Sequence, residues 1–277
     1  MPAVLSILIP ASNEAAHIGA CLDAVLRSEG LAHAQIVVAA NGCDDETAAI
    51  AKRHTAAAVQ KGWELTVLEL PAIGKIGALN AADAAAKFET RAYLDADVLV
   101  DPALFSQLTQ ALATPDPRYA SGTLRLSAAA SWSTRAYART YAKVPFVTDG
   151  VPGAGLFAVN ASGRARWGAF PDIISDDTFV RLSFTPEERI GVCAGYDWPL
   201  VEGFRALVRV RRRQNAGVDE VFARYPALAN NDEKRPVGLR QMLEMALRDP
   251  IGFGVYAAVA LAVKFSPQST QTWERGR

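Results

Sequence analysis

The amino-acid sequence predicts an α/β fold in which a mostly parallel sheet carries helices on both faces. Short apolar runs alternate with alanine-rich stretches of helical spacing in the first part of the chain, in the order βαβαβαβ. Polar residues follow these runs directly, and sheets of this kind bind ligands at the carboxyl ends of their strands. The 277 residues suffice for one large domain or two small ones, and half of them are hydrophobic, so a buried core is expected.

The first strand is predicted over Val4–Ile9, an apolar run that Pro10 ends. A helix is expected over Glu14–Arg27, with Ser12 or Asn13 as its N-cap. The same alternation predicts strands over Gln35–Ala40, Trp63–Leu68 and Arg91–Leu94, and helices that begin in Asp45–Lys52 and span Ile76–Phe88.

The second part of the chain is less regular. The patterns predict helices over Pro102–Ala113 and Ala128–Ala142, strands after the glycine-rich turn in Val151–Phe157 and over Glu202–Val210, and a helical tail from Pro236. The uncharged run Ile251–Val263 would cover roughly 20 Å as a helix, short of the ~30 Å core of a bilayer. We therefore expect a buried or interfacial helix there and no membrane span.

Composition argues against several function classes. Lys plus Arg and Asp plus Glu both number 29, and this balance argues against nucleic acid as the main partner. The cysteines Cys21, Cys43 and Cys193 form no close pair, which favours a reducing cytoplasm over a disulfide framework or a zinc site. The three histidines lack ligand spacing, so we expect neither a histidine-based metal site nor a Ser-His-Asp triad.

The sharpest local feature is Asp95-Ala96-Asp97, directly after a predicted strand. Carboxylates at positions i and i+2 can point the same way, and their oxygens are the ligands that Mg²⁺ or Mn²⁺ prefers. Such an ion keeps coordination sites for phosphate oxygens and neutralises a diphosphate leaving group. The alternative interpretation is a loop with a helix cap at Asp101.

A second acidic pair, Asp176-Asp177, lies between apolar neighbours. Partial burial of two adjacent carboxylates should perturb their pKa values, which suits a general base that takes a proton from an attacking hydroxyl. The alternative interpretation is a helix N-cap followed by a first-turn acid.

Arg211-Arg212-Arg213-Gln214 is the local basic cluster, and arginine binds phosphate in bidentate fashion, although a solvated charge run is the alternative. Lys75, just before a predicted helix, is a candidate for phosphate or base contact.

The Gly153-Ala154-Gly155 segment permits close approach of a ligand or forms a simple tight turn. Four aromatic residues are candidates for stacking on a sugar or acceptor, with core packing as the default: Trp132, Tyr137, Tyr141 and Trp167.

Together these motifs resemble a family 2 glycosyltransferase with the GT-A fold, over roughly residues 4 to 215. The segments that carry the resemblance are Leu5–Glu14, Val37–Thr47, Gly74–Asn80, Leu94–Asp97, Asp176-Asp177 and Arg212-Arg213-Gln214. In this order they are similar to the strand-one signature of the family, its V-D-D-G-S-x-D-x-T block, its G-K-x-x-A-L-N block, its D-x-D, its E-D pair and its arginine-rich block.

The resemblance implies an inverting, metal-dependent transfer of a sugar from a nucleoside diphosphate to an acceptor hydroxyl. The implied donor-binding residues are Pro10, Ser12, Asn13, Glu14, Asn41, Asp45, Lys75, Asp95, Arg212 and Arg213, and the implied ligands of Mg²⁺ or Mn²⁺ are Asp95 and Asp97. The family's base matches Asp177, but Asp176 replaces the usual Glu beside it, so the choice between these two stays open.

Two departures from the family pattern matter. Ala40 stands where the second block usually begins its acidic pair, and Asn41 takes the next place, which leaves the nucleobase open. Asn215 stands where the arginine-rich block usually ends in an aromatic residue, which argues against processive synthesis of long chains. The resemblance is therefore to the non-processive, bacterial-type members of the family. The implied setting is cell-surface polysaccharide or glycolipid synthesis. The acceptor stays unknown, although many members of the family use lipid-linked acceptors.

The expected transferase domain covers residues 1–235, with a nucleotide-binding half over about 1–100 and an acceptor half over about 101–235. Residues 236–277 form the expected helical tail. In it, Ile251, Val255, Ala258, Val259 and Ala262 would form one apolar face, with Lys264 near its end. This face packs against the core, which is the favoured interpretation, or it contacts the inner face of the cell membrane. We expect a cytoplasmic protein, peripheral at the membrane in the second case.

Other functions fit the sequence less well. A sugar-phosphate nucleotidyltransferase usually opens with a glycine-rich loop followed by Arg and Lys, and Pro10–Glu14 has neither. An NAD-dependent dehydrogenase needs Gly-x-Gly-x-x-Gly after its first strand, but the first glycine of the chain is Gly19. A non-catalytic scaffold of a membrane polysaccharide complex would use Asp249–Phe265 for contacts, and the retained acidic motifs argue against it.

Overall fold

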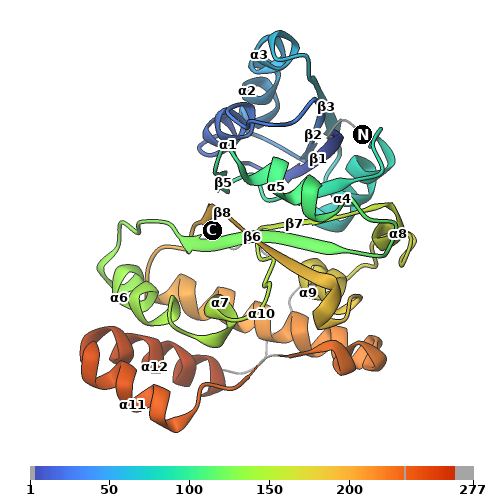
Figure 1. Ribbon diagram of the computed structural model, residues 1–277. Helices are drawn as coiled ribbons and strands as arrows, with labels where there is room; N and C mark the ends of the chain where they lie inside the picture. The colour runs from blue at the N-terminus through green and yellow to red at the C-terminus, as the bar shows by residue number, and fades with distance from the viewer. Residues whose placement is uncertain (1–3, 234, 266–277) are drawn as a thin grey trace.

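The computed structural model describes residues 4–233 and 235–265 (Figure 1). The first part of the chain follows the predicted alternation. Its elements are β1 (Val4–Ala11), α1 (Ile18–Leu26), β2 (His33–Asn41), α2 (Thr47–Arg53), α3 (Thr55–Gln60), β3 (Glu64–Leu70), α4 (Gly74–Ala84) and β4 (Arg91–Leu94). Every strand predicted here is confirmed, and α3 is an additional short helix.

The second part contains more strands than the sequence patterns predict. Its strands are β5 (Leu99–Val100), β6 (Tyr119–Leu126), β7 (Leu156–Val159) and β8 (Arg189–Trp198). Its α-helices are α5 (Leu104–Ala111), α6 (Trp132–Tyr141), α7 (Pro145–Thr148), α8 (Ala161–Arg164), α9 (Asp176–Leu182), α10 (Phe204–Arg224), α11 (Leu239–Arg248) and α12 (Pro250–Phe265). The 3₁₀ turns η1 (Pro186–Glu188) and η2 (Pro226–Asn231) complete it.

The strand predicted over Glu202–Val210 is wrong, because this segment begins the long helix α10. Leu207, Val208 and Val221 are its buried aliphatic positions, and arginines occupy much of the rest. This spacing follows the helical period of 3.6 residues rather than the strand period of two. The strands that do build this part of the sheet, β6 and β8, lack a continuous apolar pattern. A Cβ on Gly122 of β6 would lie only 2.7 Å from a carbonyl of β8, so a glycine interrupts the pattern where the strands meet.

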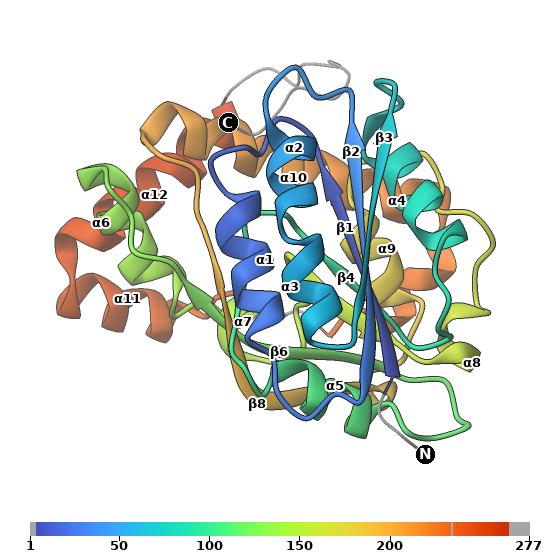
Figure 2. The same ribbon diagram turned by 90° about the horizontal axis from the view of Figure 1, so that it is seen from above.

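In the described part of the chain, the strands form one eight-stranded sheet in the order β3-β2-β1-β4-β7-β6-β8-β5. Strands β3, β2, β1 and β4 are parallel, β7 is antiparallel to β4, and β8 is parallel to β6. Figure 2 shows α1, α2 and α3 on one side of the parallel strands and α4 on the other. The predicted α/β class with a mostly parallel sheet is confirmed.

The central strands are buried on both faces, and successive residues enter different cores. Leu5, Ile7 and Ile9 of β1 pack on the side of α1, whereas Leu8 packs on the side of α4 and α9. Pro10 lies beside Ala39 in the β1–β2 register. The strands therefore end next to one another, and the polar residues that follow them meet at one edge of the sheet.

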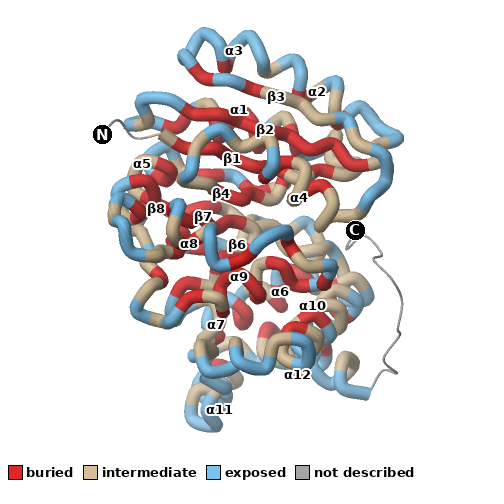
Figure 3. Tube along the Cα trace, turned by 90° about the vertical axis from the view of Figure 1, so that its right-hand side faces the viewer, coloured by how far each residue is buried: buried red, intermediate tan, exposed pale blue. Residues whose placement is uncertain are grey.

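Helices α11 and α12 form a hairpin at the end of the molecule opposite α3 (Figures 1 and 3). Val255, Val259 and Ala262 of α12 pack with Tyr137 of α6 in a third apolar cluster that also includes residues of α10. The favoured interpretation of the tail, packing against the core, therefore holds for these three residues. Over the described ranges, no helix combines the length and hydropathy that crossing a bilayer requires.

Asp83 joins α4, β4 and α8. Its buried carboxylate forms ion pairs with Arg91 at 2.7 Å and with Arg164 at 2.6 Å, and it accepts a hydrogen bond from the Tyr93 hydroxyl. Burial alone would raise the pKa of Asp83, but the hydrogen bonds from Arg164, Tyr93 and Arg91 hold it below its usual value. The fold is therefore stabilised by the ionised form of this carboxyl.

Replacing Asp83 by Asn should lower the free energy of unfolding by about 3 kcal/mol, because two largely buried guanidinium groups lose their carboxylate. A carboxyl with a lowered folded pKa stabilises the fold above its unfolded pKa of about 3.9, and this contribution is lost as the pH falls through the folded value. Urea denaturation should therefore show a smaller difference between wild type and variant in acid than at neutral pH. The matched change at the exposed Asp116 should have no effect, and an equal loss at both positions would contradict this account.

Candidate functional site

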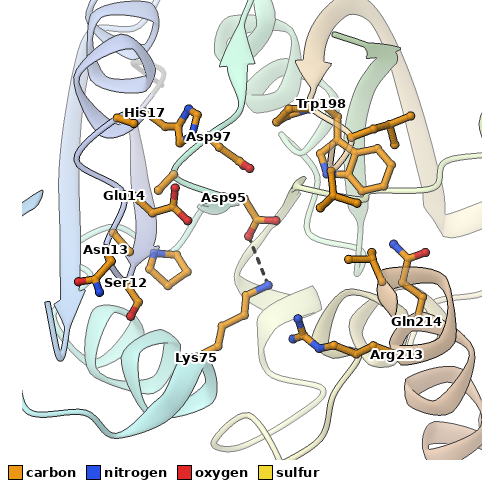
Figure 4. Close-up of a pocket in the computed structure, with 18 of the residues that line it drawn as sticks. Ser12, Asn13, Glu14, His17, Lys75, Asp95, Asp97, Trp198, Arg213 and Gln214 are labelled. Atoms are coloured by element: carbon orange, nitrogen blue, oxygen red, sulfur yellow. Dashed lines mark ion pairs between the residues drawn. The ribbon is translucent and has the colours of Figure 1, made fainter. Parts of the chain in front are cut away.

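A cavity of about 530 Å³ lies at the carboxyl ends of β1, β2 and β4 (Figure 4). One wall consists of the loop after β1, the start of α4 and the turn after β4, and the other of α6, residues 198–201 and α10. The predicted site residues that line it are Pro10, Ser12, Asn13, Glu14, Asn41, Lys75, Asp95, Asp97 and Arg213.

Hydrogen bonds between side chains and backbone fix the loop after β1. Asn13 adopts the left-handed conformation with φ at 56°, and its Oδ1 accepts a hydrogen bond from the N–H of Asp44 at 2.8 Å. The N–H of Glu14 donates to Oγ1 of Thr47, also at 2.8 Å. The loops after β1 and β2 are thus held together, and the first of them lines the cavity.

Two expectations about these loops need correction or refinement. The N-cap role predicted for Ser12 or Asn13 is wrong, because α1 begins at Ile18 with His17 at the N-cap. Asp45, predicted to bind the donor, lies outside the cavity lining and accepts a hydrogen bond from the N–H of Ala15 at 3.1 Å. Its visible contacts stabilise the paired loops.

Asn41, the last residue of β2, is buried at the edge of the cavity. Its Oδ1 accepts a hydrogen bond from the N–H of Ile73 at 2.8 Å, just before α4. The next residue, Gly42, has φ at 53°, and a Cβ there would lie 2.6 Å from the Cβ of Ala72. Because Oδ1 is engaged with the backbone, the amide nitrogen of Asn41 is the group that can donate to a ligand.

The turn after β4 carries Asp95 and Asp97 into the cavity, as Figure 4 shows. The N–H of Asp95 donates to the carbonyl of Gly155 at 2.8 Å, which ties the turn to the segment before β7. Ala96, between the two acids, is buried in the core. All three residues of the turn touch the cavity, so both carboxylates have access to the same space.

Lys75, in the first turn of α4, forms ion pairs with Asp95 at 3.3 Å and with Asp176 at 3.1 Å. Figure 4 shows its ammonium meeting Asp95 from the α4 side of the cavity. Burial alone would lower the pKa of Lys75, but the carboxylates of Asp176, Asp95 and Asp177 outweigh it and raise the pKa above its usual value. Lys75 is therefore a permanent cation between two acidic segments that lie far apart in the sequence.

Asp176 and Asp177 occupy the first turn of α9 and differ in their surroundings. Burial raises the pKa of Asp176, and Lys75 opposes this increase. Asp177 is half-buried, and its Oδ1 accepts a hydrogen bond from the N–H of Thr178 at 2.7 Å. Both residues line a small cavity that shares Pro10, Lys75 and Asp95 with the large one. The alternative interpretation holds in part: both residues are first-turn acids, but the N-cap of α9 is Ser175. Location alone therefore does not assign their chemistry.

The opposite wall presents cationic and aromatic groups. Arg213 and Gln214 reach into the cavity from α10 (Figure 4). The guanidinium of Arg211 lies over the ring of Tyr141, with Cζ 5.4 Å from the ring centroid. Burial raises the pKa of Tyr141 to about 12. Within the described ranges neither Arg211 nor Arg213 is ion-paired with a carboxylate, so both can serve an anionic ligand.

The glycine-rich turn before β7 makes room for aromatic side chains. Gly153 and Gly155 both have positive φ angles, of 66° and 75°. A Cβ on Gly153 would lie 1.6 Å from the hydroxyl oxygen of Tyr119, and one on Gly155 would lie 2.7 Å from Cδ1 of Trp198. Trp198 lines the large cavity and Gly155 lines the small one, so the turn makes room for a cavity side chain and also contributes its own backbone.

The basic cluster lies within helix α10 and not after a strand. Helical spacing places Leu207, Val210, Arg211 and Gln214 on one side of α10, all in the cavity lining, whereas Arg212 is outside it. His17 and Trp198 also line the cavity and were not predicted as site residues, whereas Arg211 and Gln214 were predicted only as members of the basic cluster. Of the aromatic candidates, Tyr137 and Tyr141 line the cavity, Trp167 packs in the core and Trp132 is exposed.

A divalent cation fits this site only together with a ligand. Over the described ranges, no group of three or more acidic, histidine or cysteine side chains is arranged to hold a metal ion. Asp95 and Asp97 supply the hard oxygens that Mg²⁺ and Mn²⁺ prefer, and the cavity beside them has space for phosphate oxygens. The residues thus fit an ion shared with a diphosphate.

The sequence profile of glycosyl transferase family 2 matches residues 6–160, more than half of the chain. No curated protein matches the sequence significantly. Among solved structures, the mannosyltransferase PcManGT from Pyrobaculum calidifontis, in complex with GDP-Man and Mn²⁺, superposes with a TM-score of 0.56 at 22% identity. The match covers 96% of this chain and 76% of that one.

Two further structures have the same architecture. TarS 1–349 from S. aureus, in complex with UDP, has a TM-score of 0.52 at 10% identity and covers 95% of this chain and 91% of its own. The glucosyl-3-phosphoglycerate synthase from M. tuberculosis has a TM-score of 0.52 at 17% identity and covers 80% of each chain. At these identities the structures show the fold, and the predicted GT-A fold is confirmed.

Replacing Lys75 by Met should lower the free energy of unfolding by about 3 kcal/mol at neutral pH, because Asp176 then lies buried near other carboxylates without its cation. The folded pKa of Asp176 should rise further. A group with a raised folded pKa destabilises the fold increasingly as the pH rises through that value, so the deficit should shrink towards about pH 4. Urea denaturation across this pH range tests the prediction, and a pH-independent deficit would contradict it. The exposed Lys61 offers the matched control.

Proposed function

The chain belongs to glycosyl transferase family 2, and on this basis we propose that it transfers a sugar from a nucleoside diphosphate to an acceptor hydroxyl, with inversion at the anomeric carbon. One observation carries the proposal: Lys75 joins Asp95 of the D-x-D turn to Asp176 of the second acidic pair, beside a cavity at the strand ends. A donor-binding segment and a base-bearing segment therefore meet where a sugar nucleotide can lie.

We assign the nucleoside to the loop after β1 and the end of β2, where Ser12, Asn13 and Asn41 line the cavity. The diphosphate would lie nearer Asp95 and Asp97, which would hold Mg²⁺ or Mn²⁺ with it. The ion would supply positive charge against the leaving group. In this arrangement the nucleotide-binding half, residues 1–100, binds most of the donor. Residues 101–235 would bind the acceptor.

Arg213 is the better candidate than Arg212 for stabilising the departing diphosphate. Arg213 lines the cavity, whereas Arg212 does not. Among the described residues, the Nε of Arg212 is buried and has no hydrogen-bond partner. A guanidinium binds phosphate oxygens through a planar pair of donors. Arg211, on the same wall, adds a second cation near the aromatic part of the site.

Asp177 is the proposed general base. Asp176 is committed to Lys75 and is more deeply buried, so Asp177 is the carboxylate of the pair that an acceptor hydroxyl can reach. The hydroxyl proton passes to Asp177 while the acceptor oxygen forms its bond to the anomeric carbon. The bond to the diphosphate oxygen breaks in the same displacement, which inverts that carbon.

The acceptor wall is largely aromatic and aliphatic, with Tyr137, Tyr141, Trp198 and Leu200 in the lining. Such a surface suits the apolar faces of a sugar ring or a lipid-linked acceptor. We propose cell-surface polysaccharide or glycolipid synthesis on the cytoplasmic side of the membrane as the setting.

Asp177→Asn should reduce the turnover number by about 10²- to 10⁴-fold, the usual contribution of a general base, while donor affinity stays within a factor of about two. Donor consumption and donor binding are measured separately on the same preparation. Asp172→Asn, an exposed change just before α9, is the control and should keep full turnover. Equal losses of donor affinity and turnover in Asp177→Asn would make this residue a ligand contact rather than the base.

Binding of one nucleoside diphosphate should depend on Mg²⁺ or Mn²⁺ and on Asp97. In a thermal-shift screen with UDP, GDP, dTDP and CDP, a ligand at about 100 times its Kd adds about 2.7 kcal/mol, a shift of several degrees. EDTA or Asp97→Ala should abolish this shift. A shift that persists in EDTA would remove the metal from the proposal, and no shift with any nucleotide would favour the non-catalytic scaffold.

A further inference from the structure

Helix α11 turns an apolar face to solvent. Leu239, Met242, Leu243 and Leu247 are all exposed, with exposed fractions of 72% for Leu239 and 84% for Leu247. Their spacing of three and four residues places them on one side of the helix. The one fully buried residue of α11 is Met245, on a different side. A helix that packed in the usual way would bury this stripe rather than expose it.

Helix α12 continues the same pattern on its outer side. Ile251, Gly254, Ala258, Leu261 and Phe265 are exposed and recur at intervals of three and four residues, so they form one stripe without a charge. The inner side of α12 is already occupied, because Val255, Val259 and Ala262 pack against α6 and α10. The outer faces of the hairpin are therefore apolar and separate from its packing face.

Basic side chains border these faces. Over residues 235–265 the basic residues are Arg235, Arg240, Arg248 and Lys264, and the acidic ones are Glu244 and Asp249. Both acids are neutralised, Glu244 by Arg248 and Asp249 by Arg139, each at 2.7 Å. The hairpin therefore combines exposed aliphatic side chains with a surplus of positive charge, the chemistry of a helix that lies in the interface of an anionic bilayer.

We propose that the outer faces of α11 and α12 dock this protein on the surface of an anionic lipid bilayer. Figures 1 and 3 show the hairpin at one extremity of the molecule, where a planar surface can reach it without contacting the parallel strands. Leucine side chains enter the headgroup region, and Arg240 and Lys264 contact lipid phosphates. The protein lies on the membrane and does not cross it.

Helices α12 and α6 pack against each other and link the proposed docking surface to the cavity. Tyr137 and Tyr141 of α6 line the cavity and belong to the same apolar cluster as Val259 of α12. A membrane on the outer side of the hairpin is thus one helix layer from the acceptor wall. Docking would bring the proposed acceptor site close to acceptors held in the lipid.

Co-sedimentation of the full chain with vesicles tests the proposal. We expect binding to vesicles of phosphatidylcholine mixed with phosphatidylglycerol in low salt, and weaker binding to phosphatidylcholine alone. Raising the salt to about 1 M shortens the screening length to about 3 Å and should weaken the anionic contribution. A folded protein that stays in the supernatant with anionic vesicles at low salt overturns the proposal.

The variant Leu243→Asp/Leu247→Asp should weaken vesicle partitioning by about tenfold or more, because two inserting side chains become anionic. The single variant Leu247→Gln, at the most exposed position, should leave the fold unchanged and weaken binding less. Val59→Asp, at a 65% exposed position of α3, is the matched control and should bind like wild type. Unchanged binding of the double variant contradicts the proposal.

Light scattering in the absence of lipid separates membrane docking from self-association. We expect a mass that is the same for wild type and the double variant. A wild-type dimer that the double variant dissociates would assign the apolar faces to a second copy of this chain and overturn the proposal. Neither measurement uses donor or turnover, so the outcome is independent of the proposed transferase chemistry.

Discussion

Four carboxylates can gather at the proposed catalytic centre because one ammonium lies among them. Asp95, Asp97, Asp176 and Asp177 come from two segments that are distant in sequence, and burial of such a group without a counter-charge would be strongly unfavourable. Lys75 bridges the two segments and is delivered by the first turn of α4. The position of α4 depends in turn on the contact between Asn41 and Ile73. The positions of the four carboxylates therefore depend on contacts among several strands and loops at this edge of the sheet.

The two walls of the cavity differ in chemistry, one polar and one largely apolar, because they are built from different elements. The wall at the strand ends consists of short loops held by hydrogen bonds between side chains and backbone, such as that of Asn13 with Asp44. The wall of α6 and α10 consists of helices whose outer sides are fixed by apolar packing. Polar ligands that need defined donors suit the first wall, and larger apolar surfaces suit the second.

The first half of the fold was predictable from sequence because its strands are buried on both faces and are therefore apolar throughout, as Val37 and Val38 illustrate. Strands β6 and β8 were not, since glycines such as Gly122 and Gly195 fill places where a side chain would clash. The residues of the loop after β1 and of the D-x-D turn belong to short motifs, and the sequence predicted that they meet at the strand ends, where they line the cavity. Trp198 was missed because it ends β8, a strand that local patterns did not predict. The basic cluster was recognised, but which of its members face the cavity depends on helix α10, which was also not predicted. The ion pairs of Lys75 are tertiary contacts that no local pattern encodes.

The third apolar cluster has a consequence for engineering. Helix α12 contributes no side chain to the cavity lining, yet Val255 and Val259 support the tyrosines that do. Trimming the C-terminus to obtain a shorter protein would therefore remove the support of the wall while sparing every motif of the family. Conversely, volume changes at Val255 or Val259 offer a way to reshape the pocket from behind, because a close-packed interior transmits such changes to neighbouring side chains.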